Sequence, residues 1–550
     1  MKINFILSLI LCTSLACFAQ GYKDGIEYYN VGQYDNAKEL LLRNLDDPST
    51  DKSEAYYYLG CIELVAGNDA EAVKYFDQGV AANPEYAYNY VGLGQLELKK
   101  GNKKEAEKLF DDAKDLCHKK DPKIIVAIGR AYYAVDEVKY KKEIEKSIKD
   151  ATKRDKEGAD VCVFQGDMLA DKKSWGDAAG WYDLAMRYDK DMVEAYVKYA
   201  NTYFYVSPQV AIQTLEKLSA SNPSSALVQR ELAEKYYEDD QWTKAAEQYG
   251  IYMQNPNHFK QDENRYAGLL FYGKKYQESY DLAEKIISEL PAGDKNAFYM
   301  KRLELYNLVA MERWNEADAL AREFFAMPLP EGTKYEAKDY TDYATALKEL
   351  GKATEAISLY VKAYELNTSK YDLLKDISSA CTDAEDYVGA AKYYQMYVDS
   401  ADYSTNDLFV LSRRYSNVAA TTPDSTAQDS IAKMEAVNKA LEYAKIVDEK
   451  VPHDTRILSQ IARIYVISEK DPRTGKALET YNQIQAILDQ DPNNKTEEKD
   501  LYIEIFRYKA IYYYLNKDDV NMKQAYLNWL DVDPTNEGLR KYIETLDKKK

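Results

Sequence analysis

A chain of 550 residues is too long for one compact core, so it contains either several globular domains or one open-ended repeat array. Apolar residues make up 46% and charged residues 30%, which excludes a disordered chain, and only 23 Gly and 14 Pro favour helices over a loop-rich architecture. The formal charge of −19 argues against nucleic acid as a partner, because phosphate binding needs a concentrated basic surface.

The first nineteen residues have the pattern of a secretory signal peptide. Lys2 precedes an apolar run from Ile3 to Leu11, and the small residue Ala19 offers a cleavage site. This pattern predicts an exported protein that is cleaved near Ala19, and no later segment is apolar enough to cross a bilayer. Cys17 follows Ser14, Leu15 and Ala16, so acylation of Cys17 stays open as an alternative that would attach the protein to a membrane.

Residues 55–84, "AYYYLGCIELVAGNDAEAVKYFDQGVAANP", predict two consecutive helices. Gly67 suits the left-handed conformation that ends many helices. Asn68 with Glu71 predicts a capping box at the start of the second helix, and Asn102 with Glu105 repeats that pattern. In the second helix Ala72, Phe76 and Val80 form an apolar stripe, and Pro84 follows its end.

The same helix pair recurs with a period of 34 residues: Gly67 matches Gly101, Ala72 matches Ala106, and Phe76 matches Phe110. In the first helix of each pair a small residue follows a larger one, as in Leu59-Gly60 and Leu93-Gly94. In the second helix a small residue is followed four places later by an aromatic one. We expect the small residues to let two helices approach closely and the aromatic residue to pack toward the neighbouring pair. The second-helix positions are Ala72, Ala106, Ala178, Ala245 and Ala356 for the small residues, and Phe76, Phe110, Tyr182, Tyr249, Tyr360 and Tyr394 for the aromatic ones.

These residues resemble the tetratricopeptide repeat (TPR). The resemblance covers residues 20–535 as about fourteen units, and it implies an all-α fold, a right-handed superhelical α-solenoid of TPR-like helix hairpins. Trp175, Trp242 and Trp314 occupy an aromatic packing position of the family pattern. One unit departs from the pattern: residues 124–157 place Lys141 where the small residue of the second helix is expected, which makes its packing doubtful.

The expected organisation has four parts. A signal peptide covers residues 1–19, an N-terminal TPR array covers 20–330, and a C-terminal array continuous with it covers 331–535. A polar capping helix and tail follow at 536–550. The segment "MPLPEG" at 327–332 is the candidate for a bend between the two halves of the array.

The sequence offers no constellation for catalysis, for a cofactor or for a metal ion. His118, His258 and His453 are far apart, each near a predicted turn, and the usual metal, nucleotide and nucleophile motifs are absent. The widely spaced Cys61, Cys117, Cys162 and Cys381 are predicted to be free thiols, mostly buried within helices. We therefore expect a protein that is not an enzyme.

The resemblance implies a concave groove lined by the first helix of each unit. Tyr and Arg are residue types that anchor interfaces, and Asn can bond to an extended peptide backbone. The alternative, that several of these side chains only pack within the array, stays open at each position. The groove positions are Tyr57, Leu64, Tyr88, Gln95, Asn201, Phe204, Arg230, Tyr237, Asn264, Phe271, Arg302 and Tyr306.

The expected function is a non-enzymatic protein–protein interaction scaffold of the bacterial cell envelope, located in the periplasm or envelope after signal cleavage. Its partners would be other proteins or extended peptide segments held in the groove. This step from repeat to partner rests on likeness to the family. The alternative is a lipid-anchored outer-membrane glycan-binding protein built from helical repeats, and the oligomeric state is left open.

Overall fold

The computed structural model describes residues 21–117 and 121–547, and within these ranges every regular element is a helix. The expected signal peptide, Cys17 and His118 lie outside the described residues. The chain divides into two compact units: unit 1 extends to Asn307 and unit 2 begins at Leu308. The array boundary expected at residues 330 and 331 stays a prediction.

Unit 1 contains the helices from α2 to most of α18. Their bounds are α2 Gly21–Asn30, α3 Tyr34–Arg43, α4 Lys52–Val65, α5 Asp69–Ala82, α6 Tyr88–Lys99, α7 Lys103–Leu116, α8 Pro122–Val135, α9 Lys141–Arg154, α10 Ala159–Asp171, α11 Trp175–Tyr188, α12 Val193–Tyr203, α13 Pro208–Ser221, α14 Ala226–Glu238, α15 Trp242–Tyr252, η1 Lys260–Asp262, α16 Glu263–Tyr272, α17 Tyr276–Glu289 and α18 Lys295–Ala310.

Unit 2 contains the remaining helices. Their bounds are α19 Trp314–Ala326, α20 Ala337–Glu349, α21 Ala353–Leu366, α22 Asp372–Asp383, α23 Tyr387–Ser400, α24 Thr405–Thr421, α25 Ala427–Lys450, α26 Thr455–Ser468, η2 Pro472–Thr474, α27 Leu478–Leu488, α28 Asn494–Glu497, α29 Lys499–Leu515, α30 Asp519–Val532 and α31 Glu537–Asp547.

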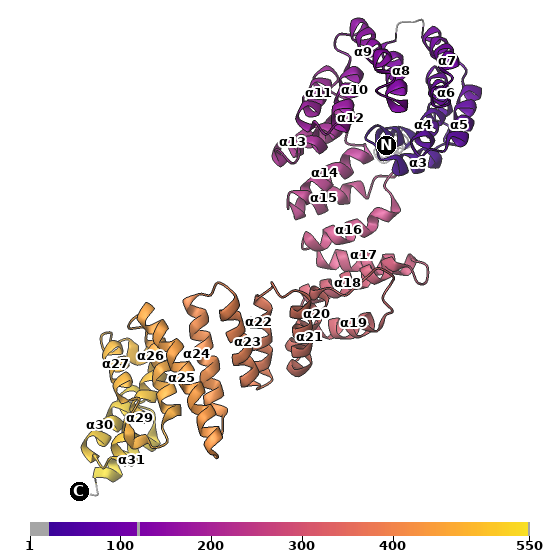
Figure 1. Cartoon of the computed structure of the whole chain (residues 1–550). Helices are drawn as coiled ribbons and strands as arrows, with labels where there is room; N and C mark the ends of the chain where they lie inside the picture. The colour runs from indigo at the N-terminus through magenta and orange to yellow at the C-terminus, as the bar shows by residue number, and fades with distance from the viewer. Residues whose placement is uncertain (1–20, 118–120, 548–550) are drawn as a thin grey trace, which may run out of the picture. The chain divides into compact units, whose positions relative to one another are not determined.

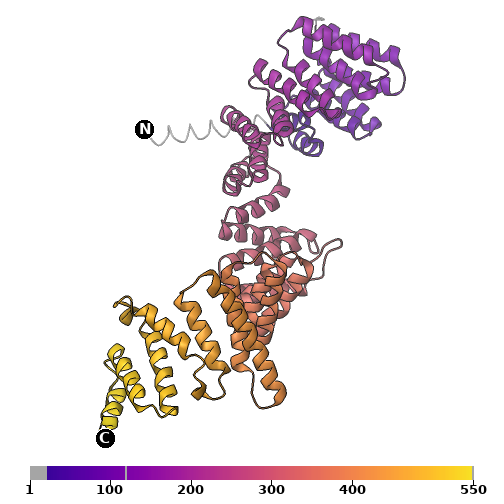
Figure 2. The ribbon, with the colours of Figure 1, turned by 60° about the vertical axis from the view of Figure 1, so that its left-hand side comes forward.

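Along the described chain the helices follow one another as fourteen consecutive pairs, from α2/α3 to α29/α30, with the short α28 and the terminal α31 outside this pairing. We call the first helix of each pair helix A and the second helix B. In unit 2, helix B of one pair also contacts helix A of the next, as α21 does with α22 and α23 with α24. Figure 2 shows these successive hairpins in orange. The expected all-α solenoid of about fourteen hairpins is confirmed.

The predicted interlock between small and aromatic residues is present. The ring of Phe76 on α5 lies against Gly60 on α4 and against Gly92 on α6, so closely that a Cβ atom on either glycine would lie 2.4 or 2.3 Å from the ring. Phe76 therefore holds its own helix A and the next one at a fixed separation. The small helix-B residues are fully buried, and the aromatic ones are at most 5% exposed: Ala72, Ala106, Ala178, Ala245, Ala356, Phe76, Phe110, Tyr182, Tyr249, Tyr360 and Tyr394.

The capping boxes predicted at Asn68 and Asn102 are wrong. Neither side chain accepts a hydrogen bond from its own helix. Instead, the amide of Asn68 donates to Oε2 of Glu63 in the preceding helix at 2.8 Å, and Asn102 donates to Glu97 in the same way. A bond to a carboxylate is stronger than a bond to a neutral group, so the amide turns toward helix A. The predicted left-handed glycines are present, with φ of +79° at Gly67 and +84° at Gly101.

The predicted position of Lys141 in its repeat unit is also wrong. The turn after α8 is longer than in the neighbouring units, so Lys141 is the first residue of α9 and not its small packing residue. The buried positions of α9 are Ile144, Ser147 and Ala151, and a Cβ on Gly129 would lie 3.0 Å from Cβ of Ser147. A second correction concerns Trp175, which is 52% exposed and is not a packing residue.

Unit 1 curves until its first hairpin meets its seventh. Helix α2 contacts α4, the next helix A, and also α12 and α14, which come about 170 to 200 residues later. Figure 1 shows α4, α6, α8, α10 and α12 on the inside of this curve and the corresponding B helices on the outside. We call the contact of α2 and α3 with α12, α14 and residues 253–262 the closure seam. One hydrophobic cluster continues across it, from Tyr28 and Leu40 to Leu227 and Phe259.

The described helices include none that combines the length and apolar character needed to cross a bilayer. All four described cysteines are free thiols: Cys61, Cys162 and Cys381 are buried, and Cys117 is half-buried. Burial raises the pKa of Cys61 to about 12, which makes this thiol unreactive.

The interlock gives the first prediction. Replacing Gly92 by Ala places a methyl group against the ring of Phe76, so we expect a loss of about 1–3 kcal/mol in the free energy of unfolding. The matched control is Gly180→Ala in α11, where no atom lies within 4 Å of the added Cβ; we expect it to be neutral or stabilising by about 0.5–1 kcal/mol. Urea denaturation followed by circular dichroism measures both, and equal effects of the two substitutions would contradict the interlock.

Candidate functional site

The inner face of unit 1 carries a group of charged side chains that join neighbouring repeats. Asp167 on α10 accepts hydrogen bonds from Nη1 of Arg130 on α8 at 2.7 Å and from Nζ of Lys198 on α12 at 2.8 Å. The hydroxyl of Tyr182 donates to the same carboxylate at 2.9 Å, and Lys198 also pairs with Glu194 at 2.6 Å. These contacts tie three successive A helices together through one carboxylate.

The charges in this group are stabilised by one another. Burial alone would raise the pKa of Asp167, but the positive charges of Arg130 and Lys198 outweigh burial and hold that pKa below its ordinary value. Asp167 is therefore ionised at neutral pH. The side chains are still reached by solvent, since Asp167 is 19%, Lys198 18% and Arg130 38% exposed. A bound segment could contact all three without unfolding the repeats.

A regular pattern lies behind these contacts. Asp167, Asn201 and Glu234 each directly follow the small residue of their helix A. Each contacts a side chain 30 or 31 residues later, in the next helix A: Asp167 contacts Lys198 at 2.8 Å, Asn201 contacts Glu231 at 3.4 Å, and Glu234 contacts Arg265 at 2.8 Å. We call these six residues, with Arg130, the inner polar ladder. The ladder follows the repeat, so it places one polar contact at each successive junction.

Tyrosines gather beside the ladder at the start of the array. Tyr57 and Tyr58 on α4 lie 5.1 Å apart between ring centroids, Tyr57 lies 5.4 Å from Tyr88 on α6, and Tyr58 lies 5.0 Å from Tyr29 on α2. With Tyr34 and Tyr86 they form the inner tyrosine cluster. All six are half-buried, so each packs one part of its ring and presents another part to solvent.

The tyrosine cluster and the ladder are close to each other. Burial is the main cause that raises the pKa of Tyr34; the positive charge of Lys198 opposes it, and the negative charge of Asp167 adds to it. The pKa of Tyr58 is likewise raised, mainly by burial, with a contribution from Glu194 on α12. Aromatic surface from α3 and α4 therefore faces charged groups of α10 and α12.

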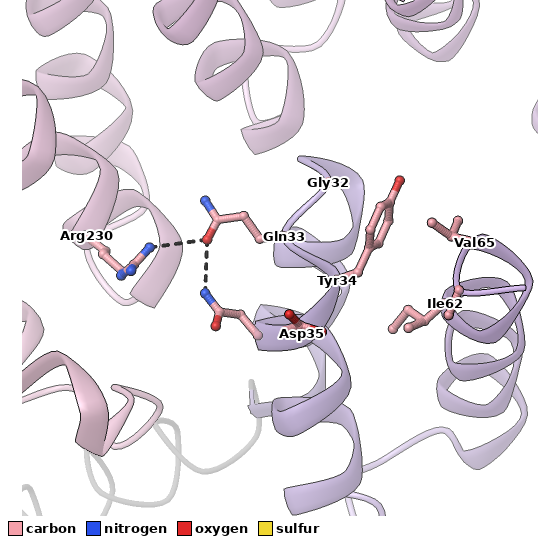
Figure 3. Close-up of a pocket in the computed structure, with 9 residues that line it drawn as sticks. Gly32, Gln33, Tyr34, Asp35, Ile62, Val65 and Arg230 are labelled. Atoms are coloured by element: carbon pink, nitrogen blue, oxygen red, sulfur yellow. Dashed lines mark hydrogen bonds between the residues drawn. The ribbon is translucent and has the colours of Figure 1, made fainter. Parts of the chain in front are cut away.

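A pocket of about 450 Å³ lies at the edge of this face (Figure 3). Its lining comes from residues 32–36 between α2 and α3, from Ile62, Val65 and Ala66 at the end of α4, and from Arg230 on α14. In Figure 3 the ring of Tyr34 points toward Ile62 and Val65, on the side away from Arg230. One side of the pocket is therefore aromatic and aliphatic, and the other side is polar.

The polar side is held by Gln33. Its Oε1 accepts hydrogen bonds from Nη1 of Arg230 at 3.2 Å and from Asn36 at 3.1 Å, and its Nε2 donates to Glu231 at 2.6 Å. Arg230 also pairs with Asp262 at 2.8 Å. Burial opposes the charge on Arg230, but Asp262 outweighs burial and raises the pKa of Arg230, which keeps it positive.

The residues expected in the groove occupy three kinds of environment. Tyr57, Tyr88, Asn201 and Arg230 lie in the cluster, the ladder or the pocket described above, and Gln95 lies half-buried on α6. Leu64 and Phe204 are at most 7% exposed and pack within the array, with Nζ of Lys235 at 4.9 Å from the Phe204 ring.

The remaining positions lie further along unit 1. Tyr237 packs under the guanidinium of Arg265, 3.8 Å from its ring centroid, and Phe271 lies 6.1 Å from Tyr306. Asn264 is half-buried, and Arg302 is 9% exposed above the Phe298 ring. These residues do not meet those of the pocket in one site. Whether any of these positions binds a partner stays a prediction.

Several residues of this inner face were not among the groove positions expected from the sequence. Arg130, Asp167 and Glu234 occupy the same place as Gln95 and Asn201, directly after the small residue of helix A, so the repeat itself contained the signal. Gln33 and Tyr34 had no comparable signal, because their importance comes from Arg230 and the other residues that the fold brings to them. In the described part of the chain no group of three or more His, Cys, Asp or Glu side chains is placed to hold a metal ion.

Comparison with known proteins identifies the repeat. Residues 22–87 and 70–122 match the family model described as the tetratricopeptide repeat, so the expected repeat is confirmed over these residues. No curated protein matches the chain.

Solved structures of this family are similar to the chain. The C-terminal part of a TPR protein from Cytophaga hutchinsonii is 21% identical, covering 50% of this chain and 98% of that one, with a TM-score of 0.38. A TPR protein from Parabacteroides merdae is 14% identical over 47% of this chain and 98% of that one, with a TM-score of 0.28. YrrB, described as a TPR protein with an unusual peptide-binding site, is 17% identical over 38% and 92%, with a TM-score of 0.27.

The ladder gives the second prediction. Asp167→Asn removes the negative charge between Arg130 and Lys198, so we expect a loss of about 2 kcal/mol in the free energy of unfolding at neutral pH. The matched control is Asp183→Asn, which breaks a more exposed pair with Arg187 on α11 and should cost about 0.5 kcal/mol. Urea denaturation at pH 7 compares the two variants.

The pH dependence follows from the lowered pKa of Asp167. Its contribution to stability is present above the ordinary Asp pKa of 3.8 and is lost as the pH falls through the lower, folded-state value. The difference between wild type and Asp167→Asn should therefore stay constant near neutral pH and shrink only below about pH 4. A difference that already disappears at pH 6 would contradict the assignment.

Proposed function

We propose that this chain is a non-enzymatic scaffold of the bacterial cell envelope, and that the inner face of unit 1 binds extended segments of other proteins. The observation that carries the proposal is the conjunction of the inner polar ladder, the inner tyrosine cluster and the pocket of about 450 Å³ on one face. TPR arrays are a repeat architecture whose curved surfaces serve binding, and here the curved surface has groups suited to a peptide.

The chemistry of the face favours a polypeptide over other ligands. The half-buried tyrosines supply rigid rings for apolar side chains, and a pocket of this size accommodates one such side chain. Exposed parts of Asp167, Arg130 and Asn201 supply both donors and acceptors, which an extended backbone needs. The described cations of the ladder are each paired with a carboxylate, so this face has no concentrated positive charge to attract phosphate.

Residue-specific crosslinking tests the binding face. A photoreactive phenylalanine analogue in place of Tyr34, in the pocket, should capture a defined protein segment in intact cells. The same analogue at Glu247, an exposed position on the outer helix α15, serves as the matched control and should not capture that segment. The captured segment, made as a peptide, should then bind purified protein and lose at least tenfold in affinity with Arg130→Ala. Equal capture from both positions would rule out the inner face as the binding site.

The proposed location rests on the N-terminal sequence and needs a separate test. Cleavage near Ala19 would leave a mature chain that begins at Gln20, whereas acylation of Cys17 would leave a lipid-modified residue 17. Mass spectrometry of the N-terminus after expression in a Gram-negative host distinguishes these two products, and an intact Met1 would overturn the proposal of export.

A further inference from the structure

The closure seam is stabilised differently from the other junctions of the array. Elsewhere each hairpin packs on its sequence neighbour, whereas at the seam α2 meets residues about 200 positions later in the chain. The apolar part of the seam is well packed: Tyr28 is fully buried and its ring lies edge-on to Phe259 at 5.3 Å between centroids. The seam therefore depends on contacts that no neighbouring hairpin supplies.

Two carboxyl groups lie at this contact, of which Asp24 is buried and Glu27 is half-buried. Asp24 and Glu27 are three residues apart on α2, so they share one face of the helix. Asp24 is 2% exposed and accepts a hydrogen bond from the side chain of Asn257 at 2.5 Å, and Glu27 accepts one from the hydroxyl of Ser225 at 2.5 Å. Both partners are neutral donors. In the described part of the chain neither carboxyl is paired with a cation.

The other charged groups near the seam are engaged elsewhere. On α12, Lys198 pairs with Asp167 and Glu194. On α2, Lys23 pairs with Glu54. On α3, Arg43 pairs with Glu39 and donates to the backbone carbonyl of His258. On α14, Arg230 bonds to Asp262 and Gln33, and Glu231 accepts from Gln33. In the segment 253–262, Lys260 pairs with Glu289, and the ring of His258 bonds to the carbonyl of Asn255.

The closed seam therefore favours protonated carboxyls. Burial is the main cause that raises the pKa of Asp24 to about 7, and the nearby Glu27 adds to it; the hydrogen bonds from Asn257 and the Ala226 backbone act in the opposite direction. Burial likewise raises the pKa of Glu27 to about 7, opposed by Ser225. When α2 is released, both groups return toward their ordinary values of 3.8 and 4.5.

We propose that the closure seam is a pH-sensitive switch. Protonation of Asp24 and Glu27 favours the closed seam, and ionisation of these two carboxyls releases α2 and α3 from α14. Because the closed state has the higher pKa values, closure is strongest at acidic pH, weakens as the pH rises from about 4 to about 7, and levels off above that range. Release would separate residues 32–36 from Arg230 and so take the pocket apart. The switch itself does not depend on the proposed function; only its effect on partner binding would.

Hydrogen–deuterium exchange of the purified full-length protein tests the switch without any partner. Protection of the amides of α2, α3 and residues 253–262 is measured at about pH 6 and about pH 8.5 and corrected for the intrinsic exchange rate. Between these pH values the equilibrium constant for closing the seam should fall by roughly tenfold for each carboxyl. This follows from carboxyl pKa values of about 7 in the closed state and about 4 in the open state. The amides of α22 and α23 in unit 2 serve as the internal reference and should not change.

Variants assign the effect to the two carboxyls. The double variant Asp24→Asn, Glu27→Gln should stay protected at both pH values, and Glu27→Gln alone should keep about a tenfold difference. The matched control is Asp376→Asn on α22, a carboxyl with a raised pKa outside the seam, which should behave like wild type. Equal protection of the wild-type seam at both pH values would overturn the proposal, whether or not the variants fold. So would a wild-type pH dependence in a folded double variant.

Discussion

The structure depends on one packing constraint: an aromatic ring on helix B packs against helix A where that helix carries glycine or another small residue. Phe76 lies against Gly60 of its own hairpin and Gly92 of the next. Phe110 and Tyr182 lie against Gly94 and Gly166 of their own hairpins. The rings are buried, so each contributes apolar surface to its junction, and their shape sets the distance between consecutive hairpins. A larger residue at either glycine would change the separation of the A helices, and hence the curvature to which every junction contributes.

The inner face follows from this spacing. Because each small residue lies at the point of closest helix approach, the residue directly after it is carried to the same place in successive units. This position holds Arg130, Asp167, Asn201 and Glu234, which explains why their polar contacts recur at intervals of about one repeat. Packing on the outer side of the A helices therefore determines where the polar side chains of their inner side lie.

The features that could be predicted from the sequence are those that recur in each repeat and depend on contacts within about one unit. The period of 34, the buried alanines, the left-handed glycines and the number of hairpins all reflect contacts between residues within about one unit, and they could be read from spacing alone. Errors arose where a side chain had two competing local partners, as at Asn68, or where a longer turn shifted the register, as before α9. The pocket could not be predicted, since its Arg230 comes 197 residues after Gln33 and no periodic pattern connects them.

The same distinction separates the closure seam from the rest of unit 1. In an array held only by neighbouring contacts, stability is close to a sum over junctions, and no single junction controls the whole. The seam adds a contact between the first and seventh hairpins, so that loss of the seam would change the surroundings of both at once. Aromatic and aliphatic residues form most of the seam, yet Asp24 and Glu27 lie among them at a cost in desolvation. A contact whose strength varies with protonation allows closure to be adjusted, which a purely apolar seam would not.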